Sequence, residues 1–337
     1  MHGLSIIICT YNGVERLEQT LKSICSLEVV SDLDLEVLLI DNKSTDETSF
    51  YSNNYLIANS PFQFRIILEE EPGLNHARKR GLLESKYDWI LFCDDDNHLF
   101  SNYINIAYNF IKNHNDIGVL GGHGLPVFES EPPVWFNKYA HSYAVGAQSD
   151  STGAINKYPA EVYGAGCFFR KDPLLKFFNN GFNTIMSDRI GNKLISGGDV
   201  EWCYIVQLTG YKIYYHDDLK FKHLMPANRL TWDYYLRLKS GISYSAGPLT
   251  SYKIIFIYGS TINSITYFFR YFFELLKVFI NYLKFIIRSL ILPRSYNQDT
   301  IDLANIIFKS KLDSYFKNIF LSYKHYSQLK RFKNASI

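Results

Sequence analysis

The sequence lacks an excess of charge of either sign. Its 35 lysine and arginine residues nearly balance 33 aspartate and glutamate residues, which leaves a formal net charge of +2. A domain dedicated to nucleic-acid binding normally carries a strongly basic surface. We therefore expect no nucleic-acid partner for this chain.

Cysteine is scarce, and its spacing excludes the common cysteine sites. The residues are Cys9, Cys25, Cys93, Cys167 and Cys203, and no two have the Cys-x-x-Cys spacing of a zinc or redox site. The apolar run at 4–9 is short and has no lysine or arginine before it, so it does not resemble a signal peptide. Both observations favour a reducing compartment, and we predict a cytoplasmic protein.

The phosphate-binding motifs of two large enzyme classes are also missing. No Gly-x-Gly-x-x-Gly follows the first apolar run, and no Gly-x-x-x-x-Gly-Lys-[Ser/Thr] occurs anywhere in the chain. These absences argue against a dehydrogenase of the Rossmann type and against a P-loop enzyme.

What the first hundred residues do contain is a regular alternation of apolar runs and segments of helical period. The apolar runs, which predict strands, are residues 4–9, 35–40, 64–68 and 89–93. Alternating strands and helices imply a parallel α/β sheet, and such sheets bind ligands beyond the carboxyl ends of their strands. The polar residues expected at that edge are Thr10, Tyr11, Asp41 and the run Asp94, Asp95, Asp96.

The acidic run is the sharpest local signal. Three adjacent carboxylates repel one another unless a cation shares them, and Asp94 and Asp96 would point the same way if extended geometry continued. A hard divalent ion accepts such oxygens and keeps positions open for substrate phosphates. A solvated loop is the competing interpretation. A calcium loop of the EF-hand type is excluded because Leu99 stands where that loop requires glycine.

A second signal is the segment 197–201, where two glycines precede Asp199 and Glu201. Glycines let a backbone approach a ligand closely, and either carboxylate is suited to take a proton from an attacking hydroxyl. The same pattern is typical of an ordinary helix start, where acidic residues are favoured by the helix dipole.

Two basic features have a structural and a functional interpretation. The cluster 78–80 either contacts phosphate or lies solvated on a helix. His223 ends a predicted strand at 212–223, and a lone histidine is more often structural than a ligand.

Together these segments resemble glycosyltransferase family 2, the inverting nucleotide-sugar transferases with the GT-A fold. The resemblance extends over about residues 1–240, and its segments follow the family's order: 5–12, 39–46, 72–81, 91–96 and 196–203. Asn42 and Lys43 replace an aspartate and a glycine of the family pattern, and Gly198 replaces a glutamate. Residues 223–232 are similar to a segment of bacterial polysaccharide transferases.

The resemblance implies a role for each matching side chain. The residues that would bind the donor are Thr10, Tyr11, Asp41, Arg78, Asp94 and Asp95. Asp96 would bind Mn²⁺ or Mg²⁺, with His223 as a further ligand, and Asp199 stands in the position of the catalytic base. The fold would be α/β of the GT-A type, with a Rossmann-like, mostly parallel sheet flanked by helices.

We predict transfer of one sugar from a nucleotide-diphosphate sugar, by default UDP-linked, to a hydroxyl of a glycan or lipid-linked acceptor. The Gln-x-x-Arg-Trp motif of processive members is absent, which favours addition of a single sugar. The expected divisions are a donor-binding half at 1–120, an acceptor-binding half with the base at 121–250, and a helical extension at 251–337. Capsule, exopolysaccharide or lipopolysaccharide assembly is the expected setting.

Two other functions stay open at this point. A sugar-nucleotide nucleotidyltransferase also uses metal-binding aspartates, but it would be expected to carry a glycine-rich, basic loop where residues 10–13 stand. A non-catalytic scaffold that binds sugar or lipid would share the fold. A donor-hydrolysis assay separates the scaffold from an enzyme.

The last third of the chain is aromatic, aliphatic and basic. Within 260–292 the polar residues fall within a wedge of roughly 80° at the helical period. They are Arg270, Glu274, Lys277, Asn281, Lys284 and Arg288. The longest uncharged run, 254–269, is shorter than the roughly 20 residues needed to cross a bilayer.

This pattern predicts an amphipathic helix that lies in a membrane interface, with its basic stripe towards anionic headgroups. We therefore predict that 254–292 contacts the cytosolic face of the inner membrane. Burial of the helix against the catalytic domain or a sister subunit is the main alternative, and a spanning hairpin is a further one.

Overall fold

The computed structural model describes residues 2–189 and 194–335. The chain forms two compact units, each built from segments that are separate in sequence. The sheet unit comprises Met1–Gly181 and Trp202–Leu230, and the helical unit comprises Phe182–Glu201 and Thr231–Ile337. The segment that carries Asp199 therefore groups with the C-terminal helices.

The sheet unit contains a nine-stranded sheet with the order β3-β2-β1-β4-β8-β6-β9-β5, and β7 pairs with β9. Its parallel part consists of β1 (Gly3–Thr10), β2 (Asp34–Asp41), β3 (Gln63–Leu68) and β4 (Trp89–Asp94). The remaining strands are β5 (Asn97–Leu99), β6 (Ile117–Phe128), β7 (Gly153–Ala154), β8 (Cys167–Arg170) and β9 (Lys212–Met225). β8 runs antiparallel to β4 and β6, whereas β9 is parallel to β6.

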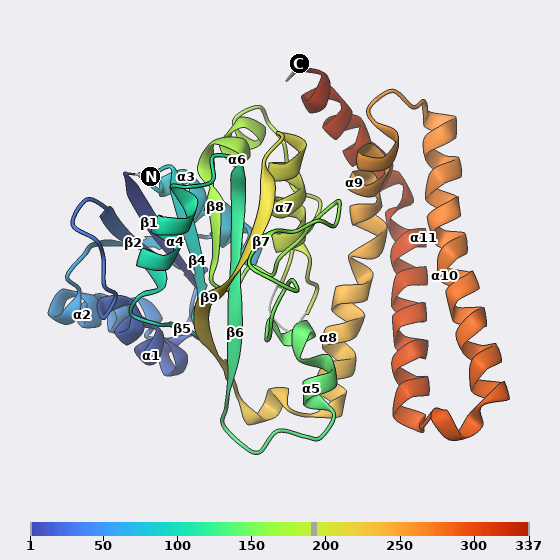
Figure 1. The fold of residues 1–337 in the computed structure, drawn as a ribbon, viewed down its shortest axis with the longest axis horizontal. Helices are drawn as coiled ribbons and strands as arrows, with labels where there is room; N and C mark the ends of the chain where they lie inside the picture. The colour runs from blue at the N-terminus through green and yellow to red at the C-terminus, as the bar shows by residue number, and fades with distance from the viewer. Residues whose placement is uncertain (1, 190–193, 336–337) are drawn as a thin grey trace. The chain divides into compact units, whose positions relative to one another are not determined.

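Helices cover both faces of this sheet (Figure 1). The helices of the sheet unit are α1 (Val14–Cys25), α2 (Thr48–Asn59), α3 (Leu74–Glu84), α4 (Tyr103–Ile111), α5 (Phe136–Tyr139) and α6 (Lys171–Phe178). α7 (Gly198–Leu208) begins in the helical unit and continues into the sheet unit.

Side-chain alternation along the strands assigns each helix to a face. Ile6 and Ile8 share one buried cluster with residues of α1, α2 and α4. Ile7 points to the other face, towards α3, where a β-carbon added at Gly81 would lie 2.4 Å from Ile7 Cγ2. The glycine at position 81 thus lets α3 pack closely on the sheet.

The four apolar runs are the four parallel strands, as predicted. All eight residues of β1 are buried, and so are seven of the eight in β2. Parallel strands covered on both faces are apolar throughout, so they appear in a sequence as continuous runs. The predicted α/β class with a mostly parallel core is confirmed.

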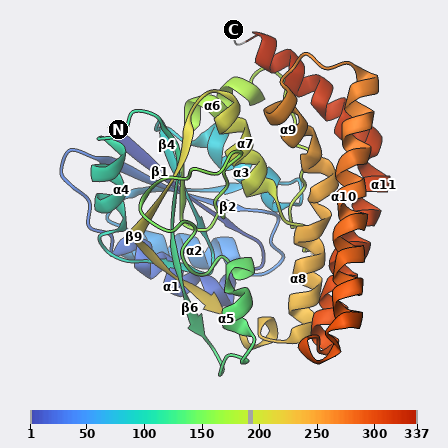
Figure 2. The ribbon, with the colours of Figure 1, turned by 45° about the vertical axis from the view of Figure 1, so that its right-hand side comes forward.

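Besides the first turn of α7, the helical unit contains α8 (Trp232–Tyr244), α9 (Ala246–Tyr258), α10 (Ser264–Ile291) and α11 (Gln298–Ala335). α8 and α9 pack along α11, and α10 and α11 form a hairpin whose helices run side by side in both views (Figure 2). The sequence-based limit at residue 250 falls within α9, and α10 begins where the Asn263 side chain accepts a hydrogen bond from the Thr266 amide.

Small residues allow close packing inside the helical unit. A β-carbon added at Gly247 would lie 2.6 Å from Ser314 Oγ, and one added at Gly241 would lie 1.8 Å from the carbonyl oxygen of Leu194. Within the described residues, no helix is both long enough and apolar enough to cross a membrane.

Candidate active site

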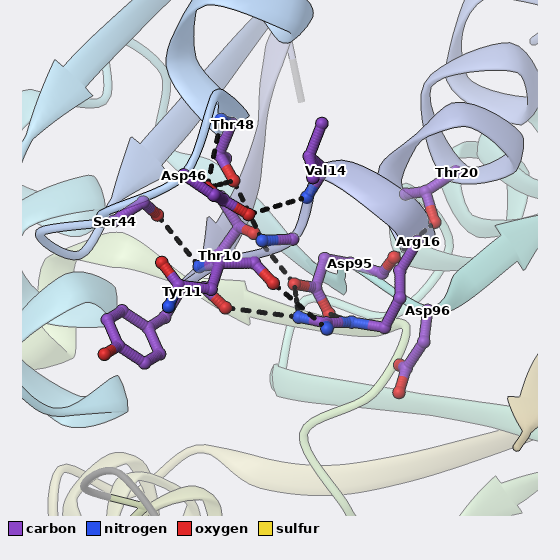
Figure 3. A network of polar contacts seen from close by, with 12 residues as sticks. Thr10, Tyr11, Val14, Arg16, Thr20, Ser44, Asp46, Thr48, Asp95 and Asp96 are labelled. Atoms are coloured by element: carbon purple, nitrogen blue, oxygen red, sulfur yellow. Dashed lines mark hydrogen bonds and ion pairs between the residues drawn. The ribbon is translucent and has the colours of Figure 1, made fainter.

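The loops that follow β1 and β2 are joined by hydrogen bonds. β1 and β2 pair in register up to Thr10 and Asp41, so their carboxyl ends meet. The Asn12 amide donates to Ser44 Oγ at 2.9 Å (Figure 3). The Thr45 amide donates to Asn12 Oδ1 at 2.8 Å. These bonds fix the positions of the predicted donor-binding residues on both strands.

Thr10 and Tyr11 have different environments at the end of β1. Thr10 is buried, whereas Tyr11 is 49% exposed, and its ring points away from the polar network (Figure 3). Asp41 is buried, and its carboxylate accepts hydrogen bonds from the Ser44 amide and the Ser49 hydroxyl. Its orientation is therefore fixed before any ligand binds.

The structure explains how Asn42 and Lys43 are accommodated. The Asn42 amide nitrogen donates to the carbonyls of Glu69 and Glu71, and its oxygen accepts from the Gly73 amide at 2.7 Å. A carboxylate cannot donate those two bonds. Lys43 has a φ of 63°, so the glycine of the family pattern is replaced without loss of the left-handed turn.

The acidic run forms a turn rather than a continued strand. β4 ends at Asp94, and the chain turns through Asp95 and Asp96 before β5. The alternation expected for an extended segment therefore does not apply beyond Asp94. Each carboxylate faces a different arginine, and the pairs are Asp94 with Arg78 at 3.4 Å, Asp95 with Arg16 at 2.8 Å, and Asp96 with Arg229 at 2.9 Å. Three separate guanidinium groups thus offset the repulsion within the run.

Asp95 links the acidic turn to β1 and α1. It accepts a hydrogen bond from Thr10 Oγ1 at 2.8 Å as well as from Arg16. In Figure 3 it points into this network, whereas the carboxylate of Asp96 points away from it. Burial, followed by the charge of Asp96, raises the pKa of Asp95, and the bonds from Arg16 and Thr10 oppose that rise.

Sequence reasoning did not identify Arg16. A usable signal was present, because Arg16 lies in the first turn of α1, where the helix dipole disfavours a cation. A basic residue at that place indicates a nearby negative partner, which is Asp95 in the structure.

Asp96 lies at the centre of a small polar cluster within the sheet unit. His223 Nε2 lies 3.3 Å from Asp96 Oδ1, and Arg229 donates to Oδ2 at 2.9 Å. The two candidate metal ligands are brought together because Asn97 of β5 pairs with His223 of β9. The other ring nitrogen, His223 Nδ1, is buried without a hydrogen-bond partner.

These residues fit a divalent ion that is shared with a substrate. Carboxylate oxygen and imidazole nitrogen are suitable donors for Mn²⁺, and Mg²⁺ is usually held by one or two carboxylates together with substrate phosphates. Within 2–189 and 194–335, no group of three or more His, Cys, Asp or Glu side chains could hold a metal ion. Asp96 and His223 therefore form at most part of a coordination shell.

Arg78 is the member of the basic cluster that faces the acidic run. It is buried, pairs with Asp94, and lies 5.5 Å from the centre of the Phe92 ring. Lys79 lies over Phe178, and Arg80 pairs with Glu84 on the same helix. Arg78, on α3, thus lies beside Asp94 at the carboxyl end of β4, and its contact with the donor stays a prediction.

Asp199 and Glu201 have different environments in the first turn of α7. Asp199 is half-buried, and its Oδ1 accepts from the Val200 amide at 2.9 Å. Glu201 is fully buried, and both of its oxygens accept hydrogen bonds from protein groups. Of the two candidate bases, Glu201 thus has both oxygens bonded to protein groups, whereas the role of Asp199 as the base stays a prediction.

Comparison with known families gives one match that covers about half of the chain. The model described as Glycosyl transferase family 2 matches residues 5–178. This region contains the loops after β1 and β2, the start of α3 and the acidic turn.

Two curated relatives align with parts of the chain. The cholesterol galactosyltransferase of Borreliella burgdorferi is 29% identical over 114 residues, which cover 34% of this chain and 30% of the relative. The poly(ribitol-phosphate) beta-N-acetylglucosaminyltransferase TarP of Staphylococcus aureus is 27% identical over 127 residues, 37% of this chain and 38% of the relative. The chain thus spans about a third of the length of these relatives.

Two solved structures resemble nearly the whole chain. A crystal structure of Staphylococcus aureus TarS in complex with UDP-GlcNAc has a TM-score of 0.53 at 14% identity, covering 98% of this chain and 90% of that one. The mannosyltransferase PcManGT from Pyrobaculum calidifontis, in complex with GDP-Man and Mn²⁺, has a TM-score of 0.52 at 13% identity, covering 99% and 85%. These likenesses concern the fold, and they confirm the predicted GT-A type.

Proposed function

Because the chain belongs to glycosyl transferase family 2, we propose that it transfers a sugar from a nucleotide-diphosphate donor to a hydroxyl acceptor in the synthesis of a cell-surface glycan. The observation that carries this proposal is the acidic turn at the carboxyl end of β4, where Asp96 is grouped with His223 and Arg229. The names of the relatives, which specify sugar transfer onto cholesterol and poly(ribitol phosphate), support a cell-surface acceptor. A UDP-linked donor is supported by the ligand of the similar TarS structure.

The proposed reaction is a single displacement with inversion at the anomeric carbon. Asp199 takes the proton of the acceptor hydroxyl. At the same time the hydroxyl oxygen bonds to the anomeric carbon, and the bond from that carbon to the diphosphate oxygen breaks. Asp96 and His223 would hold Mn²⁺ or Mg²⁺, which when bound stabilises negative charge on the diphosphate. Asp41 and Thr10 orient the nucleotide from the ends of β2 and β1, with Tyr11 beside them.

The nucleotidyltransferase alternative has less support from the site. Residues 11–13 follow β1 directly and contain no lysine or arginine. Asn12 in this loop is hydrogen-bonded to Ser44 and Thr45 in the loop after β2. The scaffold alternative is addressed by experiment, because it predicts donor binding without turnover.

The test of the proposed function is a thermal-shift screen of nucleotide sugars with Mn²⁺, followed by an assay of nucleoside diphosphate release. A ligand at 100 times its Kd stabilises the folded state by about 2.7 kcal/mol, so one UDP-sugar should raise Tm by several degrees. That sugar should then be turned over with release of UDP. If no nucleotide sugar raises Tm, the proposal is wrong, and if binding occurs without any release, the scaffold interpretation replaces it.

We also propose that α10 attaches the protein to the cytosolic face of the inner membrane. One face of α10 is buried on α11, with Tyr267 and Tyr271 in contact with Tyr326 and Tyr315. A second face carries apolar side chains that are 42–80% exposed, which are Ile265, Phe269, Phe272, Phe273, Leu276, Phe279, Ile280, Leu283, Ile287, Leu290 and Ile291. Soluble proteins rarely expose so extended an apolar surface without a partner.

The charge beside this apolar face favours a lipid surface as the partner. The stripe on the other flank of α10 contains Arg270, Lys277, Lys284 and Arg288 but a single acid, Glu274, which pairs with Lys277. Basic residues beside an exposed apolar face are typical of helices that lie in the headgroup region of an anionic membrane. A second copy of the chain would meet the same positive stripe, which opposes like-charge pairing.

We expect the full chain to float with anionic liposomes, and a Phe272→Gln/Phe279→Gln/Leu283→Gln variant to lose that binding. Lys277→Glu/Lys284→Glu should lose only the preference for anionic over neutral vesicles, since each basic residue near the surface contributes about 1 kcal/mol. Ile57→Gln, at an exposed apolar residue of α2, is the matched control and should float normally.

A truncation after Thr250 is unsuitable as a test because it cuts α9. The proposal is wrong if the chain ignores anionic vesicles or if the apolar triple variant only converts a dimer to a monomer.

A further inference from the structure

Glu201 is a fully buried carboxylate whose partners come from three separate segments of the helical unit. Its Oε1 accepts from the Ile185 amide at 2.8 Å and from the Tyr252 hydroxyl at 2.9 Å, and its Oε2 accepts from the Met186 amide at 2.9 Å. His325 Nε2 lies 3.4 Å from Oε1, a close contact without hydrogen-bond alignment. Glu201 thus connects the segment before α7 with α9 and α11.

Such a carboxylate requires its partners, because burial of an unpaired charge is strongly unfavourable. Hydrogen bonds to an ionised acceptor are about twice as strong as neutral ones, so these bonds restrain the segments that donate them. His325 is itself held, since its Nδ1 lies 2.9 Å from the hydroxyl of Ser251 on α9. The result is a rigid junction between the first turn of α7 and helices α9 and α11.

Glu201 lies two residues after Asp199, and its hydrogen bonds also restrain the backbone that precedes Asp199. Asp188 Oδ1 accepts from the Gly198 amide at 2.8 Å, while residues 185 and 186 donate to Glu201. The segment 185–188 is therefore bound to the first turn of α7 at both of its ends. Gly197 directly precedes this turn, and its φ of 133° is one that only glycine adopts readily. Without the attachments, this part of the backbone would have several accessible conformations.

We infer that Glu201, with Tyr252 and His325, is a positioning element for Asp199, and that α9 and α11 are therefore required for catalysis and not only for attachment. The inference rests on the proposed role of Asp199 as the base. A displacement of about 1 Å in a reacting group can lower a rate by about 100-fold, so restraint of the first turn of α7 has a direct effect on transfer. Tyr252 acts from α9 and His325 from α11, through Glu201.

The test compares two tyrosine-to-phenylalanine changes at buried positions of the helical unit. Tyr252→Phe removes the hydroxyl that binds Glu201, and Tyr271→Phe removes a buried hydroxyl that binds the Tyr315 carbonyl and does not contact the junction. Tyr252→Phe should lower kcat by about 10- to 100-fold, with donor Kd unchanged, and Tyr271→Phe should leave kcat near that of the parent. Both rates are measured well below the Tm of each variant, so that a loss of stability alone does not lower them.

A double variant provides the readout that a merely structural role would not change. If Tyr252 acts through Asp199, then Asp199→Asn/Tyr252→Phe should be no slower than Asp199→Asn alone, because groups that act as a unit are not additive. Additive losses, or equal kcat values for the two tyrosine variants, would overturn the inference. In those cases the proposed function stands, since it fails only if the parent does not bind a nucleotide sugar or binds it without turnover.

Discussion

Asp199→Asn is expected to bind the donor as tightly as the parent and to lose transfer by about 10²- to 10⁴-fold, the usual contribution of a general base. Asparagine keeps the size of the side chain and the oxygen that accepts from the Val200 amide, but it cannot take up a proton. Kcat, measured by UDP release at saturating donor, should carry the whole effect, and the thermal shift with donor and Mn²⁺ should match that of the parent.

The control for this change is Asp233→Asn rather than a change at Glu201. Asp233 is also an acid in the first turn of a helix, but it is solvent-exposed and pairs with Arg237 on the same helix. Its loss should leave kcat unaltered. Glu201→Gln is not a neutral comparison, because it alters a buried group with partners on both oxygens. Near-parent transfer by Asp199→Asn would assign the proton to another group.

The strands were predictable from the sequence because a strand buried on both faces consists of consecutive apolar residues. The run at 4–9 lies within β1, and the run at 89–93 lies within β4. The polar ends of these strands also follow from chain order, since parallel strands place their carboxyl ends at one edge. That reasoning brings Thr10, Asp41 and the acidic run together without knowledge of any contact.

The partners within the site were not predictable in the same way. Arg16 and Asp95 are 79 residues apart, and Asp96 and Arg229 are 133 residues apart, so no local pattern links either pair. The sequence also did not predict which segments form each of the two units, for a similar reason. Glu201 finds its hydroxyl partner Tyr252 51 residues later, and this long-range contact helps to join residues 182–201 to the C-terminal helices.

The acidic turn also shows the limit of reasoning from one chemical property. Three adjacent carboxylates suggested that they share one cation. In the structure each carboxylate instead pairs with its own arginine from another segment. Sequence alone identified the need for positive charge but not its source.

Asp96→Asn is expected to weaken Mn²⁺-dependent donor binding by at least about 100-fold, the upper range found when the partners of metal ligands are altered. The change also has an effect without metal. Loss of one of three neighbouring negative charges relieves repulsion, but the pair between Asp96 and Arg229 is lost as well. Because Asp96 is buried and an unpaired polar group costs about 1–3 kcal/mol, we expect a lower free energy of unfolding in metal-free buffer.

The two effects of Asp96→Asn are separated by a pair of measurements. Urea unfolding in EDTA reports the loss of the Arg229 pair, and isothermal titration of the folded variant with UDP-sugar, with and without Mn²⁺, reports the metal. Asp116→Asn, which removes a surface carboxylate that pairs with Lys212, should change neither by much, because exposed pairs contribute about 1 kcal/mol or less. Donor binding equal to that of the parent in Mn²⁺ would show that Asp96 has a structural role, through its contacts with Arg229 and His223. Any metal that the reaction uses would then be bound by other residues.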